Sequence, residues 1–177
     1  MTKGKVLAAA FLVSATALYG VAGGHPAQAA GSKMIGSFKD WSAHLFAEKK
    51  GKVCYMFSRP KKSEGNYTKR GDAYVQVTHR TSDKTRNEVS VTAGYPYKKG
   101  SEVAMIIDGK TFPLFTADDT AWGGDTNVDN ALVTAMKAGS SMVVQGTSAR
   151  GTRTTDTYSL SGFTAAHTAI DKACDVK

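Results

Sequence analysis

Short runs of alternating apolar and polar residues, separated by turn-forming residues, recur through the middle of this 177-residue chain. Residues 74–78 and 88–92 alternate in this way, and Asp108-Gly109 separates the apolar runs 103–107 and 112–115. Asp-Gly between two such runs is a strong hairpin signal, because both residues tolerate the positive φ of a tight turn. The other predicted strands are 41–47 and 53–58, which flank a turn centred on Gly51, and then 142–144 and 152–160. Many short strands at this spacing predict an antiparallel β-sandwich or barrel.

Two segments have the periodicity of amphipathic helices instead. Residues 128–138 place apolar side chains three and four positions apart, so they would share one helix face. Asp125, Thr126 or Asn127 can cap the start of this helix, and Gly139 is placed to end it. A second helix is predicted over about 165–174, with Thr164 as its candidate cap. The chain is therefore predicted to be mainly β with one or two short helices.

The beginning of the chain matches an export signal. Lys3 and Lys5 precede an almost uncharged apolar run over 6–22, and Ala27-Gln28-Ala29 fits the small-x-small pattern of a signal-peptidase site. A permanent membrane anchor is the alternative, but the run is short for a spanning helix, which needs about 20 residues.

These features predict a signal peptide over 1–29 and one mature domain over 30–177. The mature protein is expected in the periplasm or outside the cell, with no stable membrane span after cleavage.

The only two cysteines, Cys54 and Cys174, both belong to the predicted mature chain. An oxidising compartment favours a disulfide between them. A redox-active pair is the alternative, but such pairs usually have the close C-x-x-C spacing that is missing here. We therefore predict a structural bridge that encloses most of the domain.

The chain carries a formal charge of +8, and loss of Lys3 and Lys5 with the signal would leave +6. A basic exported protein is attracted to anionic envelope or host-surface components, although charge can also serve solubility alone. No nucleic-acid partner is expected, because the chain is predicted to be exported and the sequence contains no recognition-helix or RNA-binding motif. The densest basic cluster consists of Lys49, Lys50, Lys52, Arg59, Lys61 and Lys62.

A series of short motifs extends through nearly all of the mature chain. They are Asp40-Trp41, Val53-Cys54-Tyr55, Ser58-Arg59-Pro60, Arg70-Gly71-Asp72, Gly94-Tyr95, Tyr97-Lys98, Gly100-Ser101, the run 103–115, the helix 131–136, Gly146-Thr147-Ser148, Arg150-Gly151-Thr152, Tyr158-Ser159-Leu160, Gly162-Phe163 and Cys174. In this order and spacing the motifs resemble the invasion-associated locus B family of alphaproteobacterial envelope proteins.

The resemblance implies an immunoglobulin-like β-sandwich and a secreted or periplasmic protein, in a family whose pathogenic members are linked to host-cell invasion. It brings no catalytic residue and no cofactor. Some members have a cysteine soon after the first tryptophan, where this chain has Ser42, Ala43 and His44, so no second bridge is expected.

Three kinds of sequence pattern bear on metal binding and catalysis. The sequence 125–129 resembles the start of a calcium loop but lacks the glycine and the glutamate that an EF-hand needs at later positions, so we interpret it as a helix cap. His44 and His79 on strands and His167 on the last helix have no metal-binding spacing, and we expect solvated or incidental histidines. No G-x-S-x-G elbow and no phosphate-binding loop is present. The sequence predicts no metal, no cofactor and no enzymatic activity.

Arg70-Gly71-Asp72 follows a loop-like stretch and could engage an integrin if it were exposed. A Gly-Asp turn entering a strand explains the tripeptide without a receptor, and we favour that interpretation. Tyr95 and Tyr97 flank Pro96 beside two lysines and form a candidate binding rim, with ordinary loop packing as the alternative.

Together these observations predict an exported, non-enzymatic envelope protein that acts through surface interactions, with host-cell association as a candidate role. The alternative is a periplasmic assembly or stress factor that binds client proteins or envelope components through a sheet edge. A hydrolase with an unrecognised site is the third hypothesis.

Overall fold

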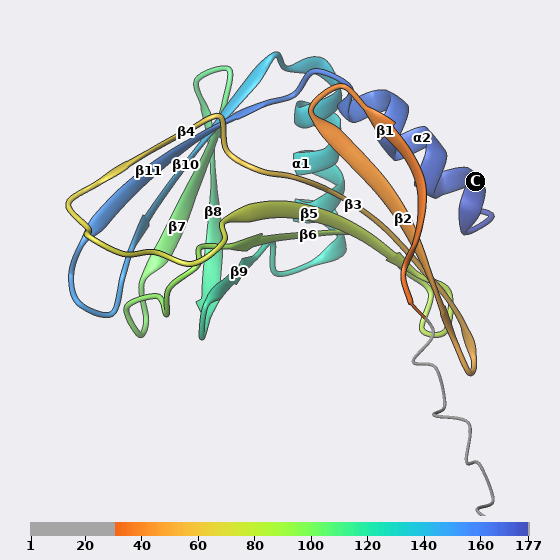
Figure 1. Cartoon of the computed structure of the whole chain (residues 1–177), viewed down its shortest axis with the longest axis horizontal. Coiled ribbons are helices and arrows are strands. Elements are labelled where there is room, and N and C mark those ends of the chain that lie inside the picture. The colour runs from red at the N-terminus through yellow and green to blue at the C-terminus, as the bar shows by residue number, and fades with distance from the viewer. Residues whose placement is uncertain (1–30, 177) are drawn as a thin grey trace, which may run out of the picture.

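The computed structural model describes residues 31–176, shown in Figure 1. The predicted signal peptide therefore lies outside the described residues. The strands are β1 (Lys33–Phe38), β2 (Trp41–Glu48), β3 (Gly51–Ser58), β4 (Lys62–Gly65), β5 (Tyr74–Arg80), β6 (Thr85–Thr92), β7 (Glu102–Ile107), β8 (Lys110–Ala117), β9 (Thr120–Trp122), β10 (Ser141–Thr147) and β11 (Arg153–Ser159). The helices are α1 (Thr126–Ala138) and α2 (Phe163–Ala173).

All eleven strands join one antiparallel sheet in the order β1-β2-β3-β5-β6-β9-β8-β7-β10-β11-β4. The mainly β, antiparallel prediction is confirmed. The two separate sheets of an immunoglobulin-like sandwich are not shown, because hydrogen bonding continues without a break from β1 to β4. The connecting piece is β9, a three-residue strand that pairs with both β6 and β8. Strand β9 was not predicted from the sequence, and without it the strands would fall into two groups.

The predicted hairpins are confirmed, but the first turn lies at residues 49–50 and not around Gly51, which is the first residue of β3. Strands β2 and β3 pair from Ser42↔Phe57 to Glu48↔Gly51, and β7 pairs with β8 across Asp108-Gly109. Asp108 and Gly109 have φ values of 46° and 82°, so both residues have the positive φ that this turn requires. Besides β9, strands β1 and β4 were missed, because neither has a clear alternating pattern of buried apolar residues.

Helix α1 begins at Thr126, two residues before the predicted start, and its cap is Asp125, one of the three predicted candidates. The Asp125 side chain accepts hydrogen bonds from the backbone N–H groups of Asn127 (2.8 Å) and Val128 (3.0 Å). Its first residues are thus a cap, in agreement with that interpretation of 125–129. Helix α2 begins earlier than predicted. Its cap is Gly162 at a φ of 94°, and Thr164 lies inside the helix, so the prediction of Thr164 as the cap was wrong. A Cβ atom at position 162 would lie 1.8 Å from the Phe38 carbonyl oxygen, which explains why glycine is needed there.

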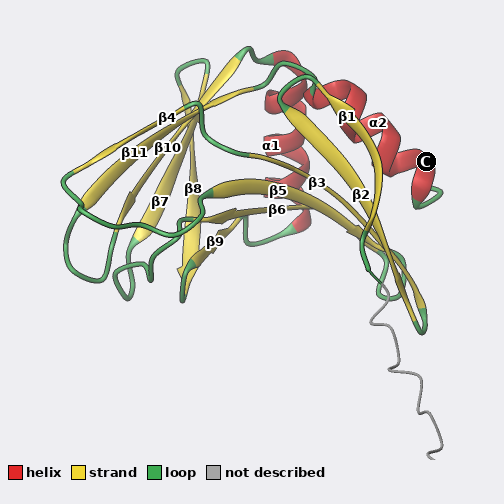
Figure 2. Cartoon of the chain, viewed as in Figure 1, coloured by secondary structure: helices red, strands yellow, loops and turns green. Residues whose placement is uncertain are grey.

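The two helices lie beside each other over the sheet, as Figure 2 shows, with α1 against β6 and α2 against β1, β2 and β3. Trp41 and Phe163 meet edge to face with ring centroids 4.9 Å apart, and both are buried. The predicted Cys54–Cys174 disulfide is present and ties the end of α2 to β3. In the chain-entropy model, closing a loop of this length stabilises the fold by roughly 4–5 kcal/mol.

Within residues 31–176, neither helix is long and apolar enough to cross a membrane.

Candidate functional site

A groove of about 720 Å³ opens where the segment after β4 faces the β10–β11 turn. One wall is residues 66–71, and the opposite wall includes residues 148–150 with Thr152 and Thr154. Residues 94–96, which follow β6, complete the lining. The groove therefore brings together three segments that are distant in the sequence, and two of them carry the predicted site residues Arg70 and Tyr95.

Arg70 links the wall formed by residues 66–71 to strand β11 and to the residue that follows β6. Its Nη1 and Nη2 donate to the two carboxylate oxygens of Asp156 at 2.7 and 2.6 Å, and its Nε donates to the Ala93 carbonyl at 2.6 Å. The Arg70 and Asp156 side chains are only 6% and 4% exposed. Burial lowers the pKa of Arg70, but hydrogen bonding and charge from Asp156 raise it further than burial lowers it, so the guanidinium stays charged.

The environment of Arg70 decides between the two interpretations of Arg70-Gly71-Asp72. The Arg70 charge is already paired and buried, so it cannot reach an external receptor. Asp72 is exposed and pairs with Arg59 at 2.9 Å. The Gly71 N–H donates to the Gly94 carbonyl at 2.9 Å, which joins the segment to the end of β6 just before β5 begins. The structural interpretation therefore accounts for Arg70 and Gly71.

The two tyrosines of the predicted rim have different roles. Tyr95 lines the groove, lies under the Arg70 guanidinium with 5.0 Å from Cζ to the ring centroid, and bonds Thr154 through its hydroxyl at 2.6 Å. Burial raises the pKa of both Tyr95 and Tyr97. Tyr97 is only 6% exposed and belongs to the hydrophobic core, so it offers no binding surface.

Several residues in the groove and beneath it were not predicted from the sequence. The centroid of the Tyr67 ring lies 5.6 Å from Arg70 Cζ. Lys69 and Arg150 are exposed and line the groove. Asp156 carried a usable signal, because it is an acid at an inward position of an alternating strand. Such a residue is rarely buried without a cation beside it.

The predicted basic cluster is divided by the fold. Lys49, Lys50 and Lys52 lie around the β2–β3 turn, and Arg59, Lys61 and Lys62 follow the other end of β3. The seven residue steps along β3 separate the two groups by roughly 23 Å. The second group is also paired with acids, Arg59 with Asp72, Lys61 with Asp40, and Lys62 with Glu64. Lys52 reaches Asp175 at 3.2 Å, which leaves Lys49 and Lys50 without an ion pair among the described residues.

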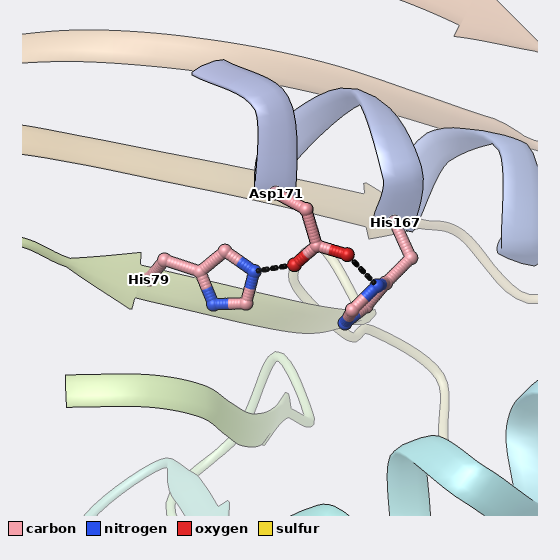
Figure 3. A group of neighbouring side chains, drawn as sticks. All are labelled: His79, His167 and Asp171. Atoms are coloured by element: carbon pink, nitrogen blue, oxygen red, sulfur yellow. Dashed lines mark hydrogen bonds and ion pairs between the residues drawn. The ribbon is translucent and has the colours of Figure 1, made fainter. Parts of the chain in front are cut away.

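Two histidines form a buried cluster with an acid, drawn in Figure 3. His79 Nε2 lies 2.9 Å from Asp171 Oδ1, and His167 Nδ1 lies 2.8 Å from Asp171 Oδ2. The imidazoles are 1% and 3% exposed, so the expectation of solvated histidines was wrong for this pair. Both were correctly placed on a strand and on the last helix, but only the tertiary fold brings α2 against β5.

The same three residues have the composition of a metal site, and hydrogen bonding argues against His79 as a ligand. His79 Nδ1 accepts the backbone N–H of Asn87 at 3.0 Å, so a neutral ring carries its proton on Nε2. That proton is donated to Asp171, which leaves Nε2 without a lone pair for a metal. Desolvation by burial lowers the pKa of both histidines, which favours neutral rings. The geometry fits a structural latch between α2 and β5.

His44 is placed differently. It lies on β2, bonds Ser42 Oγ at 3.1 Å, and stacks on Tyr55 and Phe57. A serine beside a histidine suggests a nucleophile and its base, but a catalytic arrangement also needs an acid to orient the histidine. In the described part of the chain, no acid bonds the His44 ring.

Comparison with known proteins gives one family and one solved structure. The sequence matches the family model described as Invasion associated locus B (IalB) protein over residues 41–171. No curated protein matches the sequence. The structure is similar to the crystal structure of invasion associated protein B from Bartonella henselae, with a TM-score of 0.53 and 19% sequence identity, over 78% of this chain and 95% of that chain. At this identity the likeness shows the fold alone.

Proposed function

This chain belongs to the invasion associated locus B family, and from that premise we propose that it is an exported, non-enzymatic envelope protein that acts by binding other molecules at its surface. Its contact with host cells is the form of this role that the family's link to invasion favours. The proposal places the mature protein in the periplasm or outside the cell.

The export part of the proposal is supported by the disulfide and by the start of the chain. A bridge between Cys54 and Cys174 is stable in an oxidising compartment and is rare in the reducing cytosol. The signal-peptide pattern over 1–29 agrees with that compartment.

The groove around Arg70 is the main support for the proposal that the protein binds other molecules. Its base is rigid, because Arg70 is fixed by Asp156, by the Ala93 carbonyl and by two tyrosine rings. Its volume of about 720 Å³ is within the range of sites that enclose an organic ligand, roughly 300–1,000 Å³. A binding role without chemistry is supported by the hydrogen bonds that occupy both nitrogens of His79 and, among residues 31–176, by the lack of an acid bonded to the His44 ring.

Surface exposure can be tested by adding protease to intact cells that express the protein. Cleavage, or recovery of the mature chain from the medium, is expected if the protein faces outward. Full protection, with release when the outer membrane is ruptured, would limit it to the periplasm and contradict a host-contact role. Retention in the cytosol with reduced cysteines would contradict export altogether.

A second candidate function, capture of client proteins at a sheet edge, is favoured by β1. This strand is an end of the sheet, and it exposes Met34 (53%) and Ile35 (38%). Unpaired backbone at such an edge can add a further strand. A photo-crosslinking residue at position 35 should then capture periplasmic proteins, whereas the same residue at the exposed position 49 should not. Equal capture from both positions would count against this function.

A further inference from the structure

We propose that the groove around Arg70 binds an acidic polysaccharide, a sugar chain that carries carboxylate, sulfate or phosphate groups. This inference rests on the proposed function, because it names the ligand class of the same surface. The aromatic, polar and charged side chains that the groove presents favour this class of ligand.

The aromatic and polar lining fits a sugar. Tyr67 and Tyr95 both line the groove, and both are partly exposed. The C–H face of a sugar ring is apolar and packs on an aromatic ring, while its hydroxyls need hydrogen-bond partners. Asn66, Thr68 and Thr152 supply small polar side chains around the same opening.

The charge of the groove fits an anion. Lys69 and Arg150 are exposed in its lining, and neither has an ion pair among residues 31–176. Among residues 31–176, no acidic side chain lines the groove. Asp156 lies beneath and is neutralised by Arg70, so the two outer cations face solvent without compensation. Arg70 itself is a positioning residue that fixes the lining.

A membrane surface fits less well. The exposed large apolar side chains of the described chain are Met34, Ile35 and Phe115, and none of them lines the groove. Stable attachment to lipid usually combines basic charge with apolar side chains or acyl groups that enter the bilayer. The groove offers the charge without that apolar part.

The test uses the oxidised mature protein and four probes: dextran sulfate, uncharged dextran, polyglutamate, and vesicles of an anionic phospholipid. Binding is measured by titration calorimetry at low salt. The variant Lys69→Gln/Arg150→Gln removes both groove cations, and Lys49→Gln/Lys50→Gln removes the same charge from the distant β2–β3 turn. All four positions are exposed, so each variant should fold, which circular dichroism and intact disulfide content confirm.

Dextran sulfate should bind the wild type more tightly than dextran or polyglutamate does, and added salt should weaken it. The groove variant should lose about tenfold in affinity, as expected for two exposed charge contacts, and the turn variant should lose less than twofold. Equal loss in both variants, equal binding of polyglutamate, tighter binding of the vesicles, or no binding of dextran sulfate would overturn the proposal. None of these results would affect the protease test, so a failed ligand assignment stays distinguishable from failed export or exposure.

Discussion

Replacing Arg70 with methionine should lower the free energy of unfolding by about 3–5 kcal/mol, because removing one partner of a buried ion pair leaves the other charge uncompensated. Arg70 makes two hydrogen bonds to Asp156 and one to the Ala93 carbonyl. The substitution removes all three and leaves the Asp156 carboxylate, which is only 4% exposed, without a cation. The loss is a large part of the 5–15 kcal/mol that a typical domain has in total.

Urea unfolding of the oxidised protein, followed by tryptophan fluorescence and circular dichroism, measures this difference. Arg59→Met is the matched control, because the Arg59–Asp72 pair is exposed on both sides, and it should cost less than about 1 kcal/mol. The double variant Arg70→Met/Asp156→Asn should be more stable than Arg70→Met alone, since it also removes the stranded charge. If Arg70→Met costs no more than Arg59→Met, or if Asp156→Asn only adds to the loss, the uncompensated charge of Asp156 is not the cause of the destabilisation.

Three further predictions concern the disulfide and two buried titratable groups. Cys174→Ser should lower the free energy of unfolding by about 2–5 kcal/mol in urea titrations, and a wild type equally unstable after reduction would support the same cause. Asp129, whose pKa burial raises to about 6, is more easily protonated in the folded than in the unfolded chain, so stability falls as pH rises from about 4 to 6 and the full cost of its charge is present above pH 6. Asp129→Asn should therefore gain about 1–3 kcal/mol at pH 7.5 and lose that advantage near pH 4; an advantage independent of pH would contradict this. Burial lowers the pKa of His167, so the unfolded chain binds a proton more readily and stability falls as pH drops below about 6.5. His167→Gln should flatten that decline by up to about 1.4 kcal/mol per pH unit, and an unchanged slope in thermal melts from pH 7 to 5 would rule the latch out as its source.

Features set by neighbouring residues could be predicted from the sequence. Asp108-Gly109 forms its hairpin turn because these two residues tolerate positive φ, and Asp125 caps α1 because its carboxylate reaches the next N–H groups. Both depend on interactions over two or three residues. The Cys54–Cys174 pairing was predictable for a different reason, since two cysteines allow only one intramolecular bridge.

Features set by chain segments far apart in the sequence could not be predicted. Arg70 and Asp156 are 86 residues apart, and nothing in either local sequence specifies the other as its partner. The same holds for His79 and Asp171, 92 residues apart, which meet only because α2 packs on the sheet. Conversely, Lys52 and Arg59 are near in sequence but lie toward opposite ends of one extended strand.

The sequence alone determined the Asp108-Gly109 turn and limited the cap of α1 to three residues, because local backbone preferences specify them. The unique cysteine pair determined the disulfide, and the order and spacing of short motifs indicated the family. The tertiary structure decided that the strands form one sheet through β9, that Arg70 is buried, and that the groove has two unpaired cations. The physical reason is that strand order and buried ion pairs depend on which distant segments come together. The free energy that favours one arrangement over another comes from contacts throughout the core, and no short motif contains it.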